Sequence, residues 1–181
     1  MIYETVVVTK LNNRLNKAPI GTYIKDKKVR MKIFEGSHTY ENLLNQDYFS
    51  VNVVEPIKIA EAVLTDDDEY LFYRDIPFVK GYYSIFYKVV SRKIINREDK
   101  LGKSKILLIE GEEIDRIYFN REIKPYCRAD GLIVEMAILY SRRHLKDIEK
   151  DILELYKIIK KVGSKEHKNL AEKFVKEMLK G

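Results

Sequence analysis

Apolar and polar residues alternate along the first third of the chain in the way that β-strands require. Residues 2–10 are rich in β-branched side chains, and the turn signal Asn12-Asn13 precedes a second predicted strand over 18–25. Residues 29–34 place Val, Met and Ile on one face and basic side chains on the other. These segments predict an antiparallel meander, and a further strand is expected over 48–54.

The middle of the chain continues this β pattern after one short helix. Pro56 and the apolar positions that follow it predict a helix packed over a barrel, ended by the acidic triplet 66–68. Residues 82–96 and 104–119 then predict a long hairpin that completes the barrel, with Gly111 as a bulge. The helix is expected to use Ile57, Ile59, Ala60, Val63 and Leu64 as its apolar face.

From Arg128 the apolar residues recur at helical spacing. The first helix of this region is apolar almost all round, which predicts that it is buried. A second helix is expected to end at Gly163, and Ser164 to cap a third that carries Leu170, Phe174 and Met178. We expect these last two helices to form an appended hairpin, and we divide the chain into a barrel domain over 1–128 and a helical segment packed on it over 129–181.

A short loop between two predicted strands carries the first candidate chemistry. Gly36, Ser37, His38 and Thr39 open a short helix with Ser37 or Thr39 as its N-cap, and unpaired N–H groups at a helix start attract anions. The same residues also fit a simple helix cap, and His38 also fits a solvent-facing side chain. Upstream, residues 18–21 form a small, stiff backbone segment on which a flat ligand fits. A phosphate socket beside such a surface indicates flavin mononucleotide.

Three runs in this region resemble a known superfamily in order and spacing: Ala-Pro-Ile-Gly at 18–21, Phe-Glu-Gly-Ser-His-Thr-Tyr-Glu-Asn-Leu at 34–43 and Val-Asn-Val at 51–53. They resemble the FMN-binding split-barrel superfamily, and within it the DUF447 family. Tyr118-Phe119-Asn120-Arg121, Val134-Glu135 and Ser141-Arg142 resemble that family's C-terminal signature, so the likeness covers residues 1–145. Asn12-Asn13-Arg14 departs from the family's Asp-Gly at the first turn, and Ser141 replaces its threonine.

The resemblance implies a mainly β (α+β) fold, an FMN-binding split β-barrel with short helices and a C-terminal helical extension. It also implies a homodimer with flavin near the interface. Arg121 has two alternative roles: contact with the flavin or a substrate at the interface, or an ion pair with Glu135. The residues that the resemblance assigns to the cofactor are Ala18, Pro19, Ile20 and Gly21 at the ring, Gly36, Ser37, His38, Thr39 and Asn42 at the phosphate and ribityl chain, Thr5 and Asn52 as supports, and Asn120 and Arg121 from the interface.

Three functions remain open at this point. The first is an FMN-dependent oxidoreductase of the flavin-reductase type, with a nicotinamide or a deazaflavin as electron donor. The second is a flavin-binding protein without turnover, such as a carrier, sensor or assembly partner. The third is a basic nucleic-acid-binding barrel. The sequence identifies no catalytic residue, and it contains no hydrolase triad, dinucleotide-binding glycine motif or metal-ligand cluster.

Composition narrows this choice. The net charge is +6, but most of the excess lies in residues 142–180 without interleaved aromatic residues, which indicates a solvated helical surface rather than a nucleic-acid site. Cys127 is the single cysteine, which favours a reducing cytoplasm and a structural role. The chain starts without a targeting signal and contains no apolar membrane span. Abundant Lys, Glu and Ile with a single Gln are typical of an archaeal-type thermophile protein.

Overall fold

The computed structural model describes residues 1–64, 69–99, 102–120, 122–141 and 148–179. The chain forms two compact units. The barrel unit is Glu4–Tyr126, and the helical unit combines Met1–Tyr3 with Cys127–Gly181. The N-terminal residues join the helical unit because the Ile2 N–H donates to the Val162 carbonyl (3.1 Å).

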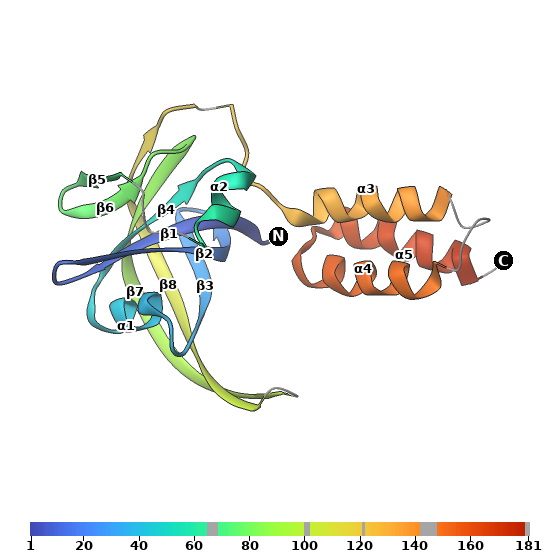
Figure 1. The fold of residues 1–181 in the computed structure, drawn as a ribbon, viewed down its shortest axis with the longest axis horizontal. Helices are drawn as coiled ribbons and strands as arrows, with labels where there is room; N and C mark the ends of the chain where they lie inside the picture. Colours follow the sequence, from blue (N-terminus) through green and yellow to red (C-terminus); the bar gives the residue numbers. More distant parts are fainter. Residues whose placement is uncertain (65–68, 100–101, 121, 142–147, 180–181) are drawn as a thin grey trace. The chain divides into compact units, whose positions relative to one another are not determined.

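Six antiparallel strands close into the barrel in the order β1-β2-β3-β8-β7-β4 (Figure 1). The mainly β fold predicted from the sequence is confirmed. The strands also hold the predicted alternation, since the burial of β3 switches at every residue. Their bounds are Tyr3–Leu11 for β1, Arg14–Lys25 for β2, Lys28–Phe34 for β3, Tyr48–Val53 for β4, Tyr83–Asp99 for β7 and Gly102–Tyr118 for β8.

Aliphatic and aromatic side chains fill the barrel interior. Phe49 and Val51 from β4 are fully buried there and pack with Ile85 and Tyr87 from β7. The Phe49 and Tyr87 rings stack with their centroids 5.5 Å apart. One end of the barrel carries α1 (His38–Asn45), whose Leu43 is buried in the same core.

The β7–β8 hairpin extends beyond the other strands of the barrel (Figure 1). Its register shifts at two places: Val90 is an extra residue on β7, opposite Gly111 and Glu110, and Ile114 is an extra residue on β8. The prediction that Gly111 itself forms the bulge is therefore wrong. Gly111 is required by packing instead, because a Cβ there would lie 2.9 Å from the Phe49 ring.

A second, two-stranded sheet was missed by the sequence patterns. It pairs β5 (Tyr70–Tyr73) with β6 (Ile76–Val79). The connecting turn places Arg74 and Asp75 in the left-handed region, with φ of 45° and 66°. These residues lack the Asn-Gly or Asp-Gly sequence that usually identifies such a tight turn. Four-residue strands also give too few positions for alternation to be recognised.

The short helix α2 (Pro56–Glu61) is present, but its predicted packing is wrong in part. None of its residues is buried. Ile57, Val63 and Leu64 are exposed at 61%, 69% and 82%, and only Ile59 is half-buried against the neighbouring apolar cluster. The acidic triplet that was expected to end this helix lies outside the described residues.

The helical unit contains α3 (Arg128–Ser141), α4 (Glu149–Val162) and α5 (Lys165–Leu179). All three pack on one another around Met136, Ile152 and Ile159, so the predicted two-helix hairpin is a three-helix unit. The prediction that the first helix is buried is also wrong, because Val134 and Ile138 are 57% and 38% exposed. A three-helix unit covers only part of each helix.

The third helix buries the expected stripe in part, since Phe174 and Met178 are half-buried against the core of the helical unit. Ala171 and Val175 are the buried residues of α5, whereas Leu170 is 45% exposed. Gly163 ends α4 as predicted, but in extended conformation with φ of −75° rather than as a left-handed cap. None of the helices in the described part of the chain is long and apolar enough to cross a membrane.

Candidate functional site

Ser37 begins the helix that follows β3. Its backbone is extended (φ −98°, ψ 150°), and its Oγ accepts the Tyr40 N–H at 3.1 Å. The same hydroxyl donates to the Phe34 carbonyl at 3.1 Å. Ser37, not Thr39, is therefore the N-cap of α1. The preceding Gly36 supplies the left-handed turn (φ +89°) that brings the chain from β3 into the helix.

The first turn of α1 retains capacity for an anion. The first N–H groups of a helix have no intrahelical acceptor, and Ser37 satisfies the one on Tyr40. The N–H groups of His38 and Thr39 precede it and lie at the positive end of the helix dipole. The His38 side chain itself is 61% exposed, with Nδ1 3.8 Å from Glu41 Oε2.

Two buried side chains of α1 hold the helix to the barrel strands. Thr39 is 1% exposed, and its Oγ1 accepts a hydrogen bond from the Asn16 amide at 2.8 Å. Asn42 is fully buried and donates to Thr9 Oγ1 at 2.9 Å. The structure thus brings together two predicted site residues, Thr39 and Asn42, with two residues that sequence reasoning had not assigned to the site.

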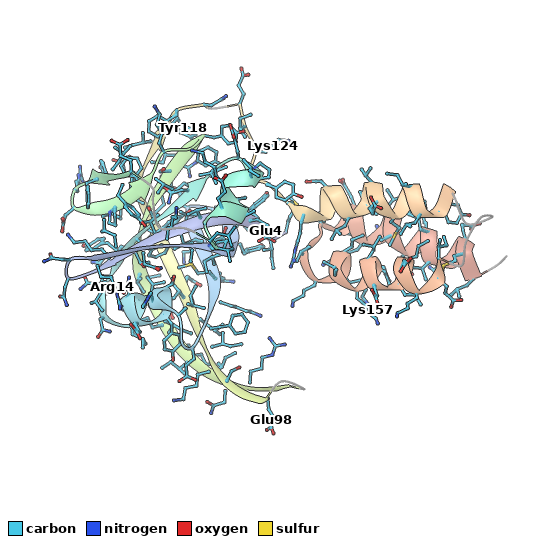
Figure 2. The ribbon with its side chains drawn as sticks, viewed as in Figure 1. Glu4, Arg14, Glu98, Tyr118, Lys124 and Lys157 are labelled. Atoms are coloured by element: carbon cyan, nitrogen blue, oxygen red, sulfur yellow. The ribbon has the colours of Figure 1, made fainter. Side chains whose placement is uncertain are left out.

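Arg14 adds a positive charge at the same place. Its Nη2 donates to Glu41 Oε2 at 2.8 Å and to Asn42 Oδ1 at 3.1 Å, and the side chain lies beside α1 (Figure 2). The hydrogen bond from Arg14 holds the pKa of the Glu41 carboxyl below its usual value. Arg14 was also missed as a site residue, because its departure from the family pattern bears only on the shape of the first turn. We call Arg14, Asn16, Thr39, Glu41 and Asn42 the β2–α1 junction.

The proposed ring-binding segment lies within β2. Ala18, Pro19 and Ile20 are half-buried and Gly21 is exposed. Thr5 on β1 lies behind this segment, where its hydroxyl donates to the Ile20 carbonyl at 3.1 Å. Thr5 therefore acts on this part of β2 through the backbone.

Two other predicted residues are bonded elsewhere in the barrel unit. Asn52 is fully buried, donates to the Val6 carbonyl at 2.9 Å and accepts from Ser84 Oγ at 2.7 Å. The Asn120 N–H donates to the Tyr82 carbonyl at 2.7 Å, beyond the end of β8. Their hydrogen bonds do not join them to the β2–α1 junction. Arg121, and with it the alternative pairing to Glu135, lies outside the described residues.

The described residues do not support metal binding or thiol catalysis. Within the described ranges, no group of three or more His, Cys, Asp or Glu side chains is placed to hold a metal ion. Cys127 is 1% exposed, and burial raises the pKa of its thiol, which opposes nucleophilic reactivity. The junction instead combines a guanidinium, one hydroxyl and two side-chain amides beside the first N–H groups of α1, and these are groups that bind phosphate esters. Its one carboxylate, Glu41, is paired with Arg14.

Comparisons with known proteins agree with this picture. The family model described as "Protein of unknown function (DUF447) N-terminal domain" matches residues 3–120, and that described as "Protein of unknown function (DUF447)" matches residues 127–176. The uncharacterized protein MJ1453 of Methanocaldococcus jannaschii is 60% identical over 183 residues, covering 95% of each chain.

Solved structures share the fold. The FMN-bound protein MM1853 of Methanosarcina mazei, itself a DUF447 protein, superposes with a TM-score of 0.53 at 22% identity, covering 97% of this chain and 94% of that one. Flavoredoxin of Methanosarcina acetivorans gives a TM-score of 0.53 at 14% identity, covering 70% of this chain and 75% of its own.

The likeness to flavoredoxin is confined to part of the chain, whereas the likeness to the Methanosarcina mazei protein and the two family models extend into the helical unit. The predicted split-barrel fold, related to that of flavin reductases, is thereby confirmed. With matches across both units and a relative at 60% identity, the chain belongs to the DUF447 family.

Proposed function

We propose that the protein binds FMN with its phosphate at the β2–α1 junction. The observation that carries this proposal is a set of hydrogen bonds between β2 and α1. Arg14 donates to Glu41 and Asn42, and Asn16 donates to Thr39. The arrangement places a cation beside free helix N–H groups, and a phosphate needs both. The bound FMN named in the Methanosarcina mazei structure supports the choice of ligand.

The remaining residues fit the other parts of the cofactor. The half-buried segment 18–21 provides a narrow apolar surface for the ring, and exposed Gly21 offers backbone polar groups without a side chain. Thr5 holds that segment through the Ile20 carbonyl. A bound flavin would supply hydride chemistry, while the protein supplies orientation and electrostatics.

For activity, we propose an oxidoreductase of the flavin-reductase type that uses a reduced nicotinamide or deazaflavin as electron donor. Flavin reductases and a flavoredoxin among the structures of the same fold support this class. A non-catalytic flavin carrier, sensor or assembly partner is the second candidate, because a shared fold does not establish turnover.

Absorption spectroscopy of the purified full-length protein tests both the proposed FMN binding and the proposed oxidoreductase activity. A flavin spectrum that persists through gel filtration is the expected result for binding, and a colourless protein that does not take up added FMN would contradict it. Anaerobic addition of the reduced donor should bleach the flavin band if the protein is an oxidoreductase. A yellow protein that no donor bleaches would favour the non-catalytic candidate.

Arg14→Gln tests the place of the phosphate. Loss of a charge-assisted hydrogen bond is typically worth about 1.5–3 kcal/mol, so FMN should bind roughly ten- to a hundredfold more weakly. Riboflavin lacks the phosphate, and its affinity should be unchanged. Arg30→Gln is the matched control, because Arg30 is an exposed β3 arginine that pairs with Glu110. An equal loss of both flavins in Arg14→Gln would place the phosphate elsewhere.

We also propose a homodimer with flavin near the interface. Tyr118 and Phe119 at the end of the long hairpin are 37% and 44% exposed, and such aromatic side chains are enriched at interfaces. Light scattering should give about twice the chain mass of 21.4 kDa. A monomer that binds FMN with full affinity would remove the argument for a shared site.

A further inference from the structure

A cavity of about 460 Å³ lies in the barrel unit among β1, α2 and the β5–β6 sheet. Its size is within the range of small-molecule sites in proteins. None of its lining residues belongs to the β2–α1 junction or to the segment 18–21. The lining consists of Val6, Val54, Lys58, Glu69, Leu71, Val79 and Lys80.

The floor of this cavity is apolar and firmly packed. Val6, Val54 and Val79 are at most 6% exposed and belong to one hydrophobic cluster. Gly81 lies against this floor, since a Cβ there would fall 2.6 Å from Val54 Cγ1 and 2.5 Å from the Val53 carbonyl oxygen. The tight backbone approach keeps the valine wall in place, so the apolar surface is preformed.

Charged side chains lie around the opening. Lys58 and Lys80 bring two ammonium groups, and Glu69 brings one carboxylate. The Lys80 ammonium lies 5.6 Å from the centroid of the Phe119 ring, and this cation–π contact holds it beside the cavity. The described lining residues therefore combine two positive charges and one negative charge with an aliphatic floor.

We propose that this cavity binds a small organic anion with an apolar body, of the type of an aryl or branched aliphatic carboxylate. The apolar body covers the valines and Leu71, and the carboxylate lies between the two lysines. Burial of the body supplies the affinity, while the exposed ammonium groups select the charge. The site is separate from the proposed flavin site and does not depend on it.

The expected effect of Glu69 distinguishes specific anion binding from nonspecific binding of apolar molecules. Its carboxylate repels an anion at the opening, so its removal should tighten binding, whereas loss of Lys58 or Lys80 should weaken it. A purely apolar cavity would respond to none of these changes.

The test is a displacement titration on the full-length protein. Anilinonaphthalene sulfonate, an aromatic anion, is the fluorescent probe, and phenylbutyrate and its neutral analogue phenylbutanol are the competitors. Phenylbutyrate should displace the probe more effectively than phenylbutanol. Lys58→Gln and Lys80→Gln should each weaken phenylbutyrate about two- to fivefold, which is the range for exposed charge pairs, and Glu69→Gln should strengthen it.

Two variants serve as controls. Lys93→Gln removes an exposed β7 lysine outside the cavity and should leave the titration unchanged. Leu71→Phe fills the cavity and should abolish displacement while circular dichroism remains that of the folded protein. Displacement that persists in Leu71→Phe, or equal effects of phenylbutyrate and phenylbutanol, would overturn the proposal. So would full displacement of the probe by stoichiometric FMN, because the cavity would then be part of the flavin site.

Discussion

The two units of the protein differ in what they bury. Within the described ranges, every buried Ser, Thr, Asn and Lys side chain lies in the barrel unit, and the examples with the most complete bonding are Asn42 and Asn52. The buried side chains of the helical unit are apolar, with Met136, Ile152 and Ile159 at their centre.

This difference matters because buried polar groups lower stability unless each finds a partner. Aliphatic packing tolerates exchange of one side chain for another of similar volume, whereas a hydrogen-bonded amide tolerates very little. The barrel unit therefore contains the buried positions whose chemical identity matters, and Thr39 and Asn42 of the β2–α1 junction are among them. The helical unit is stabilised by the volume and apolar character of its buried side chains.

The largest expected effect compares one buried position in each unit. Asn52→Leu should lower the free energy of unfolding by about 2–4 kcal/mol, because the Val6 carbonyl loses its donor and Ser84 loses its acceptor. Met136→Leu, an exchange of similar volume at a fully buried position, should cost less than about 1.5 kcal/mol. Chemical denaturation followed by circular dichroism measures both. Losses of equal size would remove the contrast between the units.

Thr39→Ala tests whether a buried polar residue of the barrel unit also contributes to FMN binding. Thr39 Oγ1 accepts from Asn16, which leaves its hydroxyl proton to donate to an anion. FMN should therefore bind roughly ten- to a hundredfold more weakly, and riboflavin should be scarcely affected. Titration with both ligands decides the outcome. Equal weakening would show that buried Thr39 only holds Asn16 and the helix cap.

One hydrogen-bonded group of the helical unit gives a smaller effect. His167 Nδ1 accepts the Ser164 N–H at 3.2 Å, and His167 Nε2 lies 2.9 Å from Asp130 Oδ1, which joins α5 to α3. His167→Ala removes this capping arrangement and should cost about 1 kcal/mol. His167→Gln keeps an acceptor at the same position and should cost less. Thermal unfolding of the pair tests this, and identical melting temperatures would argue against a capping role.

The smallest effect concerns an exposed carboxylate of the barrel. The hydrogen bond from Arg30 Nε (2.7 Å) holds the pKa of Glu110 below its usual 4.5. The stabilisation is therefore present above pH 4.5 and is lost as the pH falls through the lower folded-state pKa. In Arg30→Gln the Glu110 pKa, followed by NMR, should move back toward 4.5. An unchanged titration would mean that the pair does not form in solution.

Strong local patterns allowed much of the fold to be predicted. The alternation over 29–34 identified β3 because its side chains line one wall of the core. The start of α1 was recognised as well, although the sequence left Ser37 and Thr39 open as its cap and the structure assigns Ser37. The resemblance of a few short runs led to the family. Patterns failed where elements were short, as at β5 and β6, or where burial depended on distant neighbours, as at Val134.

The sequence by itself determined the first three strands as neighbours, the helical C-terminal region, the family and the residues of the loop that opens α1. It did not determine the place of β4, which pairs with β1 and β7. The tertiary structure decided which of those residues meet: Arg14 and Asn16 reach Thr39 and Asn42 across the barrel end, while Asn52 is bonded to Ser84. Local propensity and period act within about one turn or one strand, so they carry no information on such contacts. The packing of α1 on β2 and the pairing of β4 with β7 bring residues 23 and 32 positions apart within hydrogen-bond distance.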